Sequence, residues 1–172
     1  MPFELRVADI MQKEFSAIDP DATIRDAVES LYGFGKDEAH APVSQSLVVI
    51  ENDGDLAGVL TMFDILRAVE PPYLRDRAPL AGIAWEGFFK DVIHQAETLS
   101  VGDIMTPWAK VQSVTPTDRL IKALEVMVNS HVRRLPVCEG RQVVGVIRLF
   151  DIFQEVAREM LAAGGDEKGS DA

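Results

Sequence analysis

The chain has 172 residues, 47% of them hydrophobic and 26% charged, a balance that is typical of a soluble globular protein. Its formal net charge of −11 argues against a nucleic-acid partner, because nucleic-acid binding depends on a basic surface. No apolar run approaches the roughly 18 residues of a membrane span, and the first residues lack the basic and apolar regions of a signal peptide. We therefore expect a cytoplasmic protein with no membrane partner.

An ordered set of short matches indicates that the chain repeats itself. Val7–Met11 matches Val101–Met105, and Gly58–Leu66 matches Gly145–Phe153. Because the intervening matches keep the same order, the sequence predicts a tandem repeat of about sixty residues per copy. The predicted organisation is a first repeat at residues 4–68, a linker at 69–98, a second repeat at 99–161 and a disordered tail at 162–172.

The first copy reads as strand, helix, two strands and helix. Thr23 and Asp26 form a predicted capping box before apolar residues at helical spacing, and the turn at residues 52–55 joins two strands. The predicted elements are a strand at 15–18, a helix from Ile24 that Gly33 and Gly35 end, a loop at 36–45, strands at 47–50 and 56–60, and a helix at 63–69 before Pro71-Pro72.

The second copy repeats this order, with a shorter path between its helix and hairpin. The predicted elements are a strand at 110–114, a helix from Leu120 to Val128, strands at 135–138 and 143–147, and a helix at 150–161 before Gly164-Gly165. Sixty residues give each β-α-β-β-α copy little margin to bury its apolar faces. We therefore predict an α/β (α+β) fold in which two repeats pack sheet to sheet with pseudo-twofold symmetry, which creates two clefts.

The linker contains an apolar series at helical spacing: Trp85, Phe88, Phe89, Val92 and Ile93. One interpretation is that this helix packs on the chain's own core. The other is that it forms a dimer or partner interface, where aromatic residues are enriched. The sequence leaves both open. The single cysteine, Cys138, lies in an apolar run, and we expect it to pack in the core.

Each copy also carries a polar pair where a strand is expected to end and a helix to begin: Thr61 with Asp64, and Arg148 with Asp151. Backbone N–H groups at a helix start favour anions such as phosphate. A carboxylate at that place can accept two hydrogen bonds from a vicinal diol such as a ribose. The alternative is that the carboxylate only caps the helix. For one copy alone we would favour capping, and the repetition favours a binding site.

These motifs together resemble a tandem cystathionine-β-synthase (CBS) domain pair, also called a Bateman module. The resemblance rests on the paired Asp-Ile-Met openings, Leu135-Pro136-Val137 and the two glycine-to-aspartate motifs. It implies that adenine nucleotides or related adenosyl ligands bind in the clefts between repeats, and that the modules dimerise. We expect a stand-alone regulatory module that binds AMP, ADP, ATP or an S-adenosylmethionine-like effector, forms a homodimer and signals to an unknown regulated protein. The alternative is a structural dimerisation or scaffold module without a ligand.

The family geometry implies that each site combines residues of both copies. In the favoured site Asp64 would hold ribose hydroxyls, Thr61 a phosphate or ribose oxygen, and Arg133 and Arg134 the phosphates. Its other expected members are Gln112, Ser113 and Val114. In the second site Arg148 replaces the Thr or Ser of the family pattern, so it could bind phosphate or pair with Asp151. That site would include Ser16, Ala17, Ile18, Gln45 and Ser46.

Catalytic and metal-binding patterns are missing from the sequence. His40, His94 and His131 are scattered and show no metal-ligand spacing, and no nucleophile motif occurs. His131 is typical of a helix-capping or surface position. We therefore expect neither enzymatic activity nor a metal site.

Overall fold

The computed structural model describes residues 4–32, 46–70 and 88–163. The chain divides into two compact units, one formed by Ser16–Val111 and the other by Met1–Phe15 together with Gln112–Ala172. Several predicted features fall outside the described residues: Gly33, Gly35, the loop at 36–45, Pro71-Pro72, Trp85, and the tail from Gly164-Gly165 onward.

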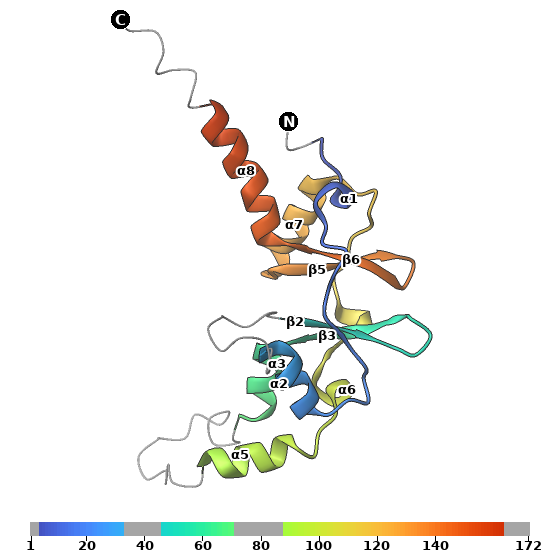
Figure 1. Cartoon of the computed structure of the whole chain (residues 1–172), viewed down its shortest axis with the longest axis vertical. Coiled ribbons are helices and arrows are strands. Elements are labelled where there is room, and N and C mark those ends of the chain that lie inside the picture. The colour runs from blue at the N-terminus through green and yellow to red at the C-terminus, as the bar shows by residue number, and fades with distance from the viewer. Residues whose placement is uncertain (1–3, 33–45, 71–87, 164–172) are drawn as a thin grey trace, which may run out of the picture. The chain divides into compact units, whose positions relative to one another are not determined.

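The unit Ser16–Val111 is built on a four-stranded sheet (Figure 1). The strand order is β1-β2-β3-β4, with β1 parallel to β2 and the other pairs antiparallel. The strands are β1 (Ala17–Ile18), β2 (Ser46–Ile50), β3 (Leu56–Thr61) and β4 (Thr106–Pro107). Three of these were predicted, to within two residues at each end, whereas β4 was not.

The two predicted helices of the first repeat begin with the same capping device. The predicted box before α2 (Ile24–Tyr32) is confirmed, because the Thr23 N–H and hydroxyl donate to Asp26 Oδ2 at 3.0 and 2.7 Å. Helix α3 (Met62–Ala68) begins one residue earlier than predicted. Buried Ala27 and Leu31 of α2 pack with Leu47 of the sheet in one core cluster.

Three further elements lie in the described part of this unit: α5 (Phe88–Ala96), α6 (Val101–Ile104) and the 3₁₀ helix η1 (Trp108–Lys110). The α6 segment belongs to the second repeat in sequence, but it packs on the sheet of the first. Its Val101 N–H donates to the Ala22 carbonyl at 2.9 Å, and the Val101 side chain is fully buried in the same core.

The other unit pairs a hairpin with three helices. Strands β5 (Arg134–Glu139) and β6 (Gln142–Arg148) are antiparallel, and α1 (Val7–Ile10), α7 (Leu120–Ser130) and α8 (Leu149–Ala163) accompany them. The two repeats exchange their first segments: α6 of the second repeat packs in the first unit, and α1 of the first repeat packs in this unit. The Leu120 N–H donates to the Leu5 carbonyl at 2.8 Å, and Val7 is buried against Leu120, Ala123 and Met127.

Two smaller predictions in this unit are confirmed. Cys138 is buried in β5, and burial raises the pKa of its thiol to about 11, so the thiol stays protonated at neutral pH. His131 is exposed and ends α7 as a left-handed cap with φ of 55°, and its N–H donates to the Met127 carbonyl.

The predicted strand at 110–114 is wrong. Lys110 ends η1, and within this stretch only Val114 makes a β-bridge, parallel to Val137. The neighbouring backbone groups have other partners: the Thr115 N–H donates to Asp118 Oδ2 at 2.8 Å, and the Val111 N–H donates to the Trp108 carbonyl at 3.1 Å. The turns on both sides therefore limit the pairing to one residue.

The exchanged segments lie against one glycine in each hairpin. A Cβ atom added at Gly58 would lie 2.3 Å from the Thr106 carbonyl oxygen and 2.8 Å from the Met105 sulfur. At Gly145 it would lie 2.9 Å from both the Gln12 carbonyl oxygen and the Met11 sulfur. The Asp-Ile-Met motif and the glycine motif are therefore the two sides of one close contact, formed once in each unit.

We predict that Gly58→Ala and Gly145→Ala each lower the free energy of unfolding by about 1–3 kcal/mol or more, because the neighbour at each position includes backbone that cannot rotate away. Gly58→Ala should cost more, since its nearest atom is closer. A suitable control is Gly140→Asn, because Gly140 has open space around it and a φ of 64° that Asn tolerates. Urea unfolding measures all three, and equal stability of Gly58→Ala and wild type would contradict the close contact.

Candidate functional site

The first candidate site lies where β3 ends and α3 begins. Thr61 is the N-cap of α3, and its N–H and hydroxyl both donate to Asp64 Oδ2, at 2.8 and 2.9 Å. The Asp64 N–H donates back to Thr61 Oγ1 at 3.2 Å. Within the described residues, Asp64 Oδ1 has no hydrogen-bond donor. The capping interpretation is therefore correct for one carboxylate oxygen, and the other oxygen remains available to a ligand.

Several other predicted site residues lie in the same unit as Thr61. Ser46 is directly opposite Thr61 in the β2–β3 register, and Ala17 pairs with Val48 on the next strand. The Ser16 carbonyl accepts a hydrogen bond from the Val48 N–H at 3.0 Å. Ile18 follows in β1, and Gln45 lies outside the described residues.

The second candidate site repeats the position with different chemistry. Arg148 Nη2 donates to Asp151 Oδ1 at 2.5 Å, and Arg148 Nε and the backbone N–H donate to Oδ2 at 2.9 and 3.2 Å. Both oxygens of Asp151 are therefore occupied, and the side chain is only 6% exposed. This hydrogen bonding raises the pKa of the Arg148 guanidinium. Of the two roles predicted for Arg148, the structure shows the pairing with Asp151.

A second arginine lies directly opposite Arg148 across the hairpin. Arg134 pairs with Arg148 in the β5–β6 register, and burial together with the charge of Arg148 lowers the pKa of Arg134, while Asp151 opposes that shift. Arg133 is exposed, and its carbonyl accepts from the Leu149 N–H at 2.8 Å. Like charges at opposite positions are destabilising. Two guanidinium groups beside one buried carboxylate make this end of the hairpin locally positive in an acidic chain.

Each predicted site is therefore divided between the two units, with about half of its residues in each. Thr61 and Asp64 lie with Ser16–Ile18 and Ser46, whereas Arg148 and Asp151 lie with Arg133 and Arg134. Gln112, Ser113 and Val114 belong to the same unit as the arginines, and Val114 accepts from the Cys138 N–H at 2.8 Å. The combination of residues from both units remains a prediction.

Comparison with known proteins identifies the family. A CBS domain model matches residues 7–71 and again residues 101–158. The chain belongs to the CBS domain family. Its fold is α+β with two CBS repeats, as predicted.

Two curated relatives match part of the chain. The chain is 30% identical over 88 residues to the mitochondrial CBS domain-containing protein CBSX3 of Arabidopsis thaliana, and covers 43% of that protein. It is 31% identical over 85 residues to an uncharacterised 33.4 kDa protein of Thermofilum pendens, and covers 28% of it. The chain thus spans less than half the length of either relative, and the match takes in 49% of this chain in both cases.

Among solved structures, CBSX2 in complex with AMP matches 90% of this chain and 98% of its own, with 20% identity and a TM-score of 0.64. CBSX2 from Arabidopsis thaliana matches 90% of this chain and 96% of its own, with 21% identity and a TM-score of 0.66. The protein MJ1225 from Methanocaldococcus jannaschii matches 89% of this chain and 48% of its own, with 18% identity and a TM-score of 0.68. At these identities the likeness shows the CBS fold.

Other kinds of site were searched for in residues 4–32, 46–70 and 88–163. No group of three or more His, Cys, Asp or Glu side chains there could hold a metal ion. No helix in those ranges combines the length and the apolar character needed to cross a bilayer.

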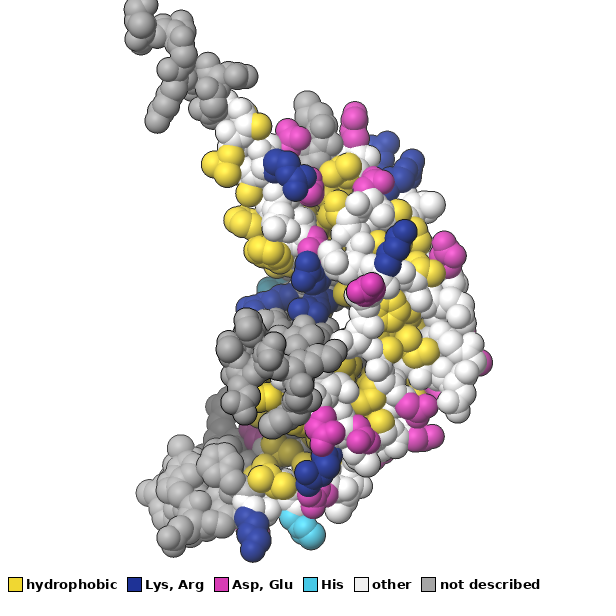
Figure 2. All heavy atoms as spheres, in the orientation of Figure 1, with side chains coloured by type: hydrophobic (Ala, Val, Ile, Leu, Met, Phe, Trp, Pro, Cys, Tyr) yellow, Lys and Arg dark blue, Asp and Glu magenta, His cyan; other side chains and the backbone are white. Residues whose placement is uncertain are grey.

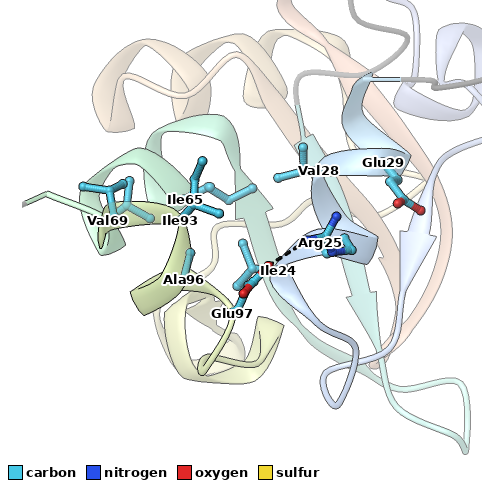
Figure 3. Close-up of a pocket in the computed structure, with 10 residues that line it drawn as sticks. Ile24, Arg25, Val28, Glu29, Ile65, Val69, Ile93, Ala96 and Glu97 are labelled. Atoms are coloured by element: carbon cyan, nitrogen blue, oxygen red, sulfur yellow. Dashed lines mark hydrogen bonds and ion pairs between the residues drawn. The ribbon is translucent and has the colours of Figure 1, made fainter. Parts of the chain in front are cut away.

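Sequence reasoning missed a pocket of about 460 Å³ in the unit Ser16–Val111, between α2, α3 and α5 (Figure 3). Val92 and Ile93 of α5 line it, which favours the interpretation that this helix packs on its own unit. The side chains of Phe88 and Phe89 are not described. No local motif reveals the pocket, because its walls come from three separate segments.

We predict that Asp151→Asn lowers the free energy of unfolding by about 1–3 kcal/mol, because it leaves the Arg148 guanidinium without its carboxylate at a largely buried position. This value is below that of a fully buried pair, because the Arg148 side chain is 37% exposed. Asp64→Asn should cost about 1 kcal/mol or less, since it weakens only a cap. Urea unfolding of both variants tests the order, and a larger loss for Asp64→Asn would contradict it.

Proposed function

We propose that the chain is a regulatory module that binds an adenine nucleotide through Asp64 and Thr61. The observation that carries this proposal is Asp64 Oδ1, which has no hydrogen-bond donor in the part of the chain that the structure describes, while three hydrogen bonds between Thr61 and Asp64 hold the carboxylate in place. A carboxylate fixed in this way can accept hydrogen bonds from the two hydroxyl groups of a ribose without reorganising. Preorganised acceptors of this kind lower the cost of binding.

The choice of an adenine nucleotide is supported by the family and by two solved structures that resemble the chain. CBSX2 was crystallised with AMP, and MJ1225 is described as a candidate archaeal homologue of g-AMPK. We propose that Arg133 and Arg134 bind the phosphates, because guanidinium binds phosphate through bidentate, charge-assisted hydrogen bonds. Gln112, Ser113 and Val114 would contribute to the same site. AMP, ADP, ATP and an S-adenosylmethionine-like compound are the effectors to compare.

We propose that the second site, with Arg148, Asp151, Ser16, Ala17, Ile18, Gln45 and Ser46, binds more weakly or not at all. Ribose binding by Asp151 would require Arg148 to release it, and the Asp151 side chain is only 6% exposed. The two repeats would then differ in function although they share a fold.

We propose that the two CBS repeats, matched at residues 7–71 and 101–158, signal to a separate, still unidentified protein in the cytoplasm. We also propose that it forms a homodimer through exposed apolar side chains of α3 and α8. Phe63 and Leu66 of α3 are 68% and 66% exposed, and the corresponding residues of α8, Phe150 and Phe153, are 58% and 62% exposed. Figure 2 shows apolar side chains along α8, at the upper left.

We predict that isothermal titration detects binding of at least one of AMP, ADP, ATP and S-adenosylmethionine, and that Asp64→Ala weakens it by about 1.5–3 kcal/mol, the range for hydrogen bonds to a charged group. Asp151→Ala should weaken it less. The absence of heat with all four compounds at millimolar concentration would refute the sensing function and leave the ligand-free scaffold.

The matched control for this titration is Asp26→Ala. Asp26 makes the same capping box with Thr23 that Asp64 makes with Thr61, but at α2, and it is not a predicted site residue. Asp26→Ala should therefore lower the free energy of unfolding about as much as Asp64→Ala does, but it should bind the nucleotide with wild-type affinity. Equal loss of affinity in both variants would mean that helix capping, and not ligand contact, explains the effect of Asp64.

We predict that the wild-type chain sediments as a dimer and that the double variant Phe150→Ser, Phe153→Ser sediments as a monomer, because it removes an exposed apolar patch. Circular dichroism should be unchanged, since neither side chain is buried. A folded double variant that remains dimeric would exclude the α8 patch as the self-association surface.

A further inference from the structure

We propose that the pocket between α2, α3 and α5 binds a small molecule with an apolar body and one carboxylate group. Its volume of about 460 Å³ falls within the range of known small-molecule sites. Thr61, Asp64 and the other residues predicted for the nucleotide sites do not line it. The proposal therefore does not depend on the nucleotide function.

The walls of the pocket are aliphatic and come from all three helical segments. Figure 3 shows Ile24 and Val28 of α2, and Ile93 and Ala96 of α5. It also shows Ile65 of α3 and Val69, the residue that follows α3. Ile24 is buried at 4% exposure, but Val28 and Ile93 are 37% and 56% exposed. Helix α5 therefore covers the α2–α3 face without closing on it. Apolar surface left facing water in this way gains free energy when an apolar ligand covers it.

The polar part of the pocket is an ion pair that joins α2 to α5. Arg25 Nη2 donates to Glu97 Oε1 at 2.7 Å, and the two side chains are 66% and 45% exposed. An ion pair this exposed contributes little to stability, so a ligand can replace one partner at small cost. The Glu97 carboxylate also shows that the Arg25 guanidinium is positioned to bind a carboxylate at this rim.

Three features favour an anionic ligand on Arg25 over a cationic ligand on Glu97. Arg25 is fixed within α2, next to Ile24 and one turn before Val28, whereas Glu97 follows the last residue of α5. The imidazole Nδ1 of His94 lies 4.0 Å from Glu97 Oε2, so Glu97 has a second partner besides Arg25. The remaining charged lining residue, Glu29, points away from the aliphatic walls in Figure 3.

The test is a titration of the full chain, labelled with ¹³C at the isoleucine δ1 methyl groups, with octanoate as the probe. We expect octanoate to shift the methyl signals of Ile24, Ile65 and Ile93. The signals of Ile147 and Ile152, which are buried in the other unit, should not move. Octan-1-ol has the same eight-carbon chain without a charge, and octylammonium carries a positive charge on that chain. Both should bind at least about fivefold more weakly than octanoate.

Two variants at the rim should change the affinity in opposite directions. Arg25→Gln should weaken octanoate by about tenfold or more, and Arg25→Lys less, because lysine keeps the charge but not the bidentate geometry. Glu97→Gln should strengthen binding about two- to fivefold, because it removes the competing carboxylate. The matched control is Glu155→Gln, which removes the ion pair with Arg158 in the other unit and should leave the affinity for octanoate unchanged.

The proposal is overturned if the three methyl signals do not move with octanoate, if octylammonium binds more tightly than octanoate, or if both Arg25 variants fold and bind like wild type. None of these results affects the nucleotide proposal, because AMP binding is read at Asp64 by a separate titration.

Discussion

One close contact joins the two repeats within each unit, and both contacts depend on the absence of a side chain. Gly58 lies against Met105 and Thr106, and Gly145 lies against Met11 and Gln12. In each contact the strand of one repeat meets the first segment of the other repeat. Each exchanged segment also places a fully buried valine, Val101 or Val7, in the core of the unit that it joins. The two repeats are separate in sequence but interdependent in structure.

The same contacts set the position of the candidate sites. Thr61 and Arg148 each lie three residues after the glycine, at the point where the strand becomes a helix. A one-residue shift of either strand would place a side chain between the crossing backbones and would turn the polar pair to the other face. The glycine therefore fixes the register, and the register fixes where the hydroxyl or guanidinium meets the carboxylate.

The sequence was sufficient for most of the fold and for the existence of the two motifs. Apolar spacing located α2, α3, α7 and α8 and both hairpins, because these elements depend on local patterns. It failed at residues 110–114, where turns at Thr115 and Trp108 take the backbone groups that a strand would use. It could not show the segment exchange or the three-walled pocket, because both join residues that are distant in sequence.

The sequence predicted which residue types form each candidate site, but not which of the two carboxylates keeps an oxygen available to a ligand. The sequence placed a carboxylate at each helix start, and it left open whether Arg148 would bind phosphate or pair with Asp151. The hydrogen bonds decide this, because they leave one oxygen of Asp64 available and occupy both oxygens of Asp151. A difference of one residue type, threonine against arginine, thus separates two positions that are equivalent in the fold.

Helix α3 connects the two proposed binding regions of the first repeat. Its first turn carries Asp64, and the next residue, Ile65, lines the pocket with Val69. A ligand that contacts Ile65 and Val69 therefore contacts the same seven-residue helix, or its C-cap, whose first turn carries Asp64. If each ligand favours one position of α3, their affinities must be linked, and the linkage is the same in both directions. Helix α3 can provide this link because its first turn is fixed by the capping box, whereas the side that carries Ile65 faces the pocket. The pocket exists because α5 does not pack fully against this side of α3.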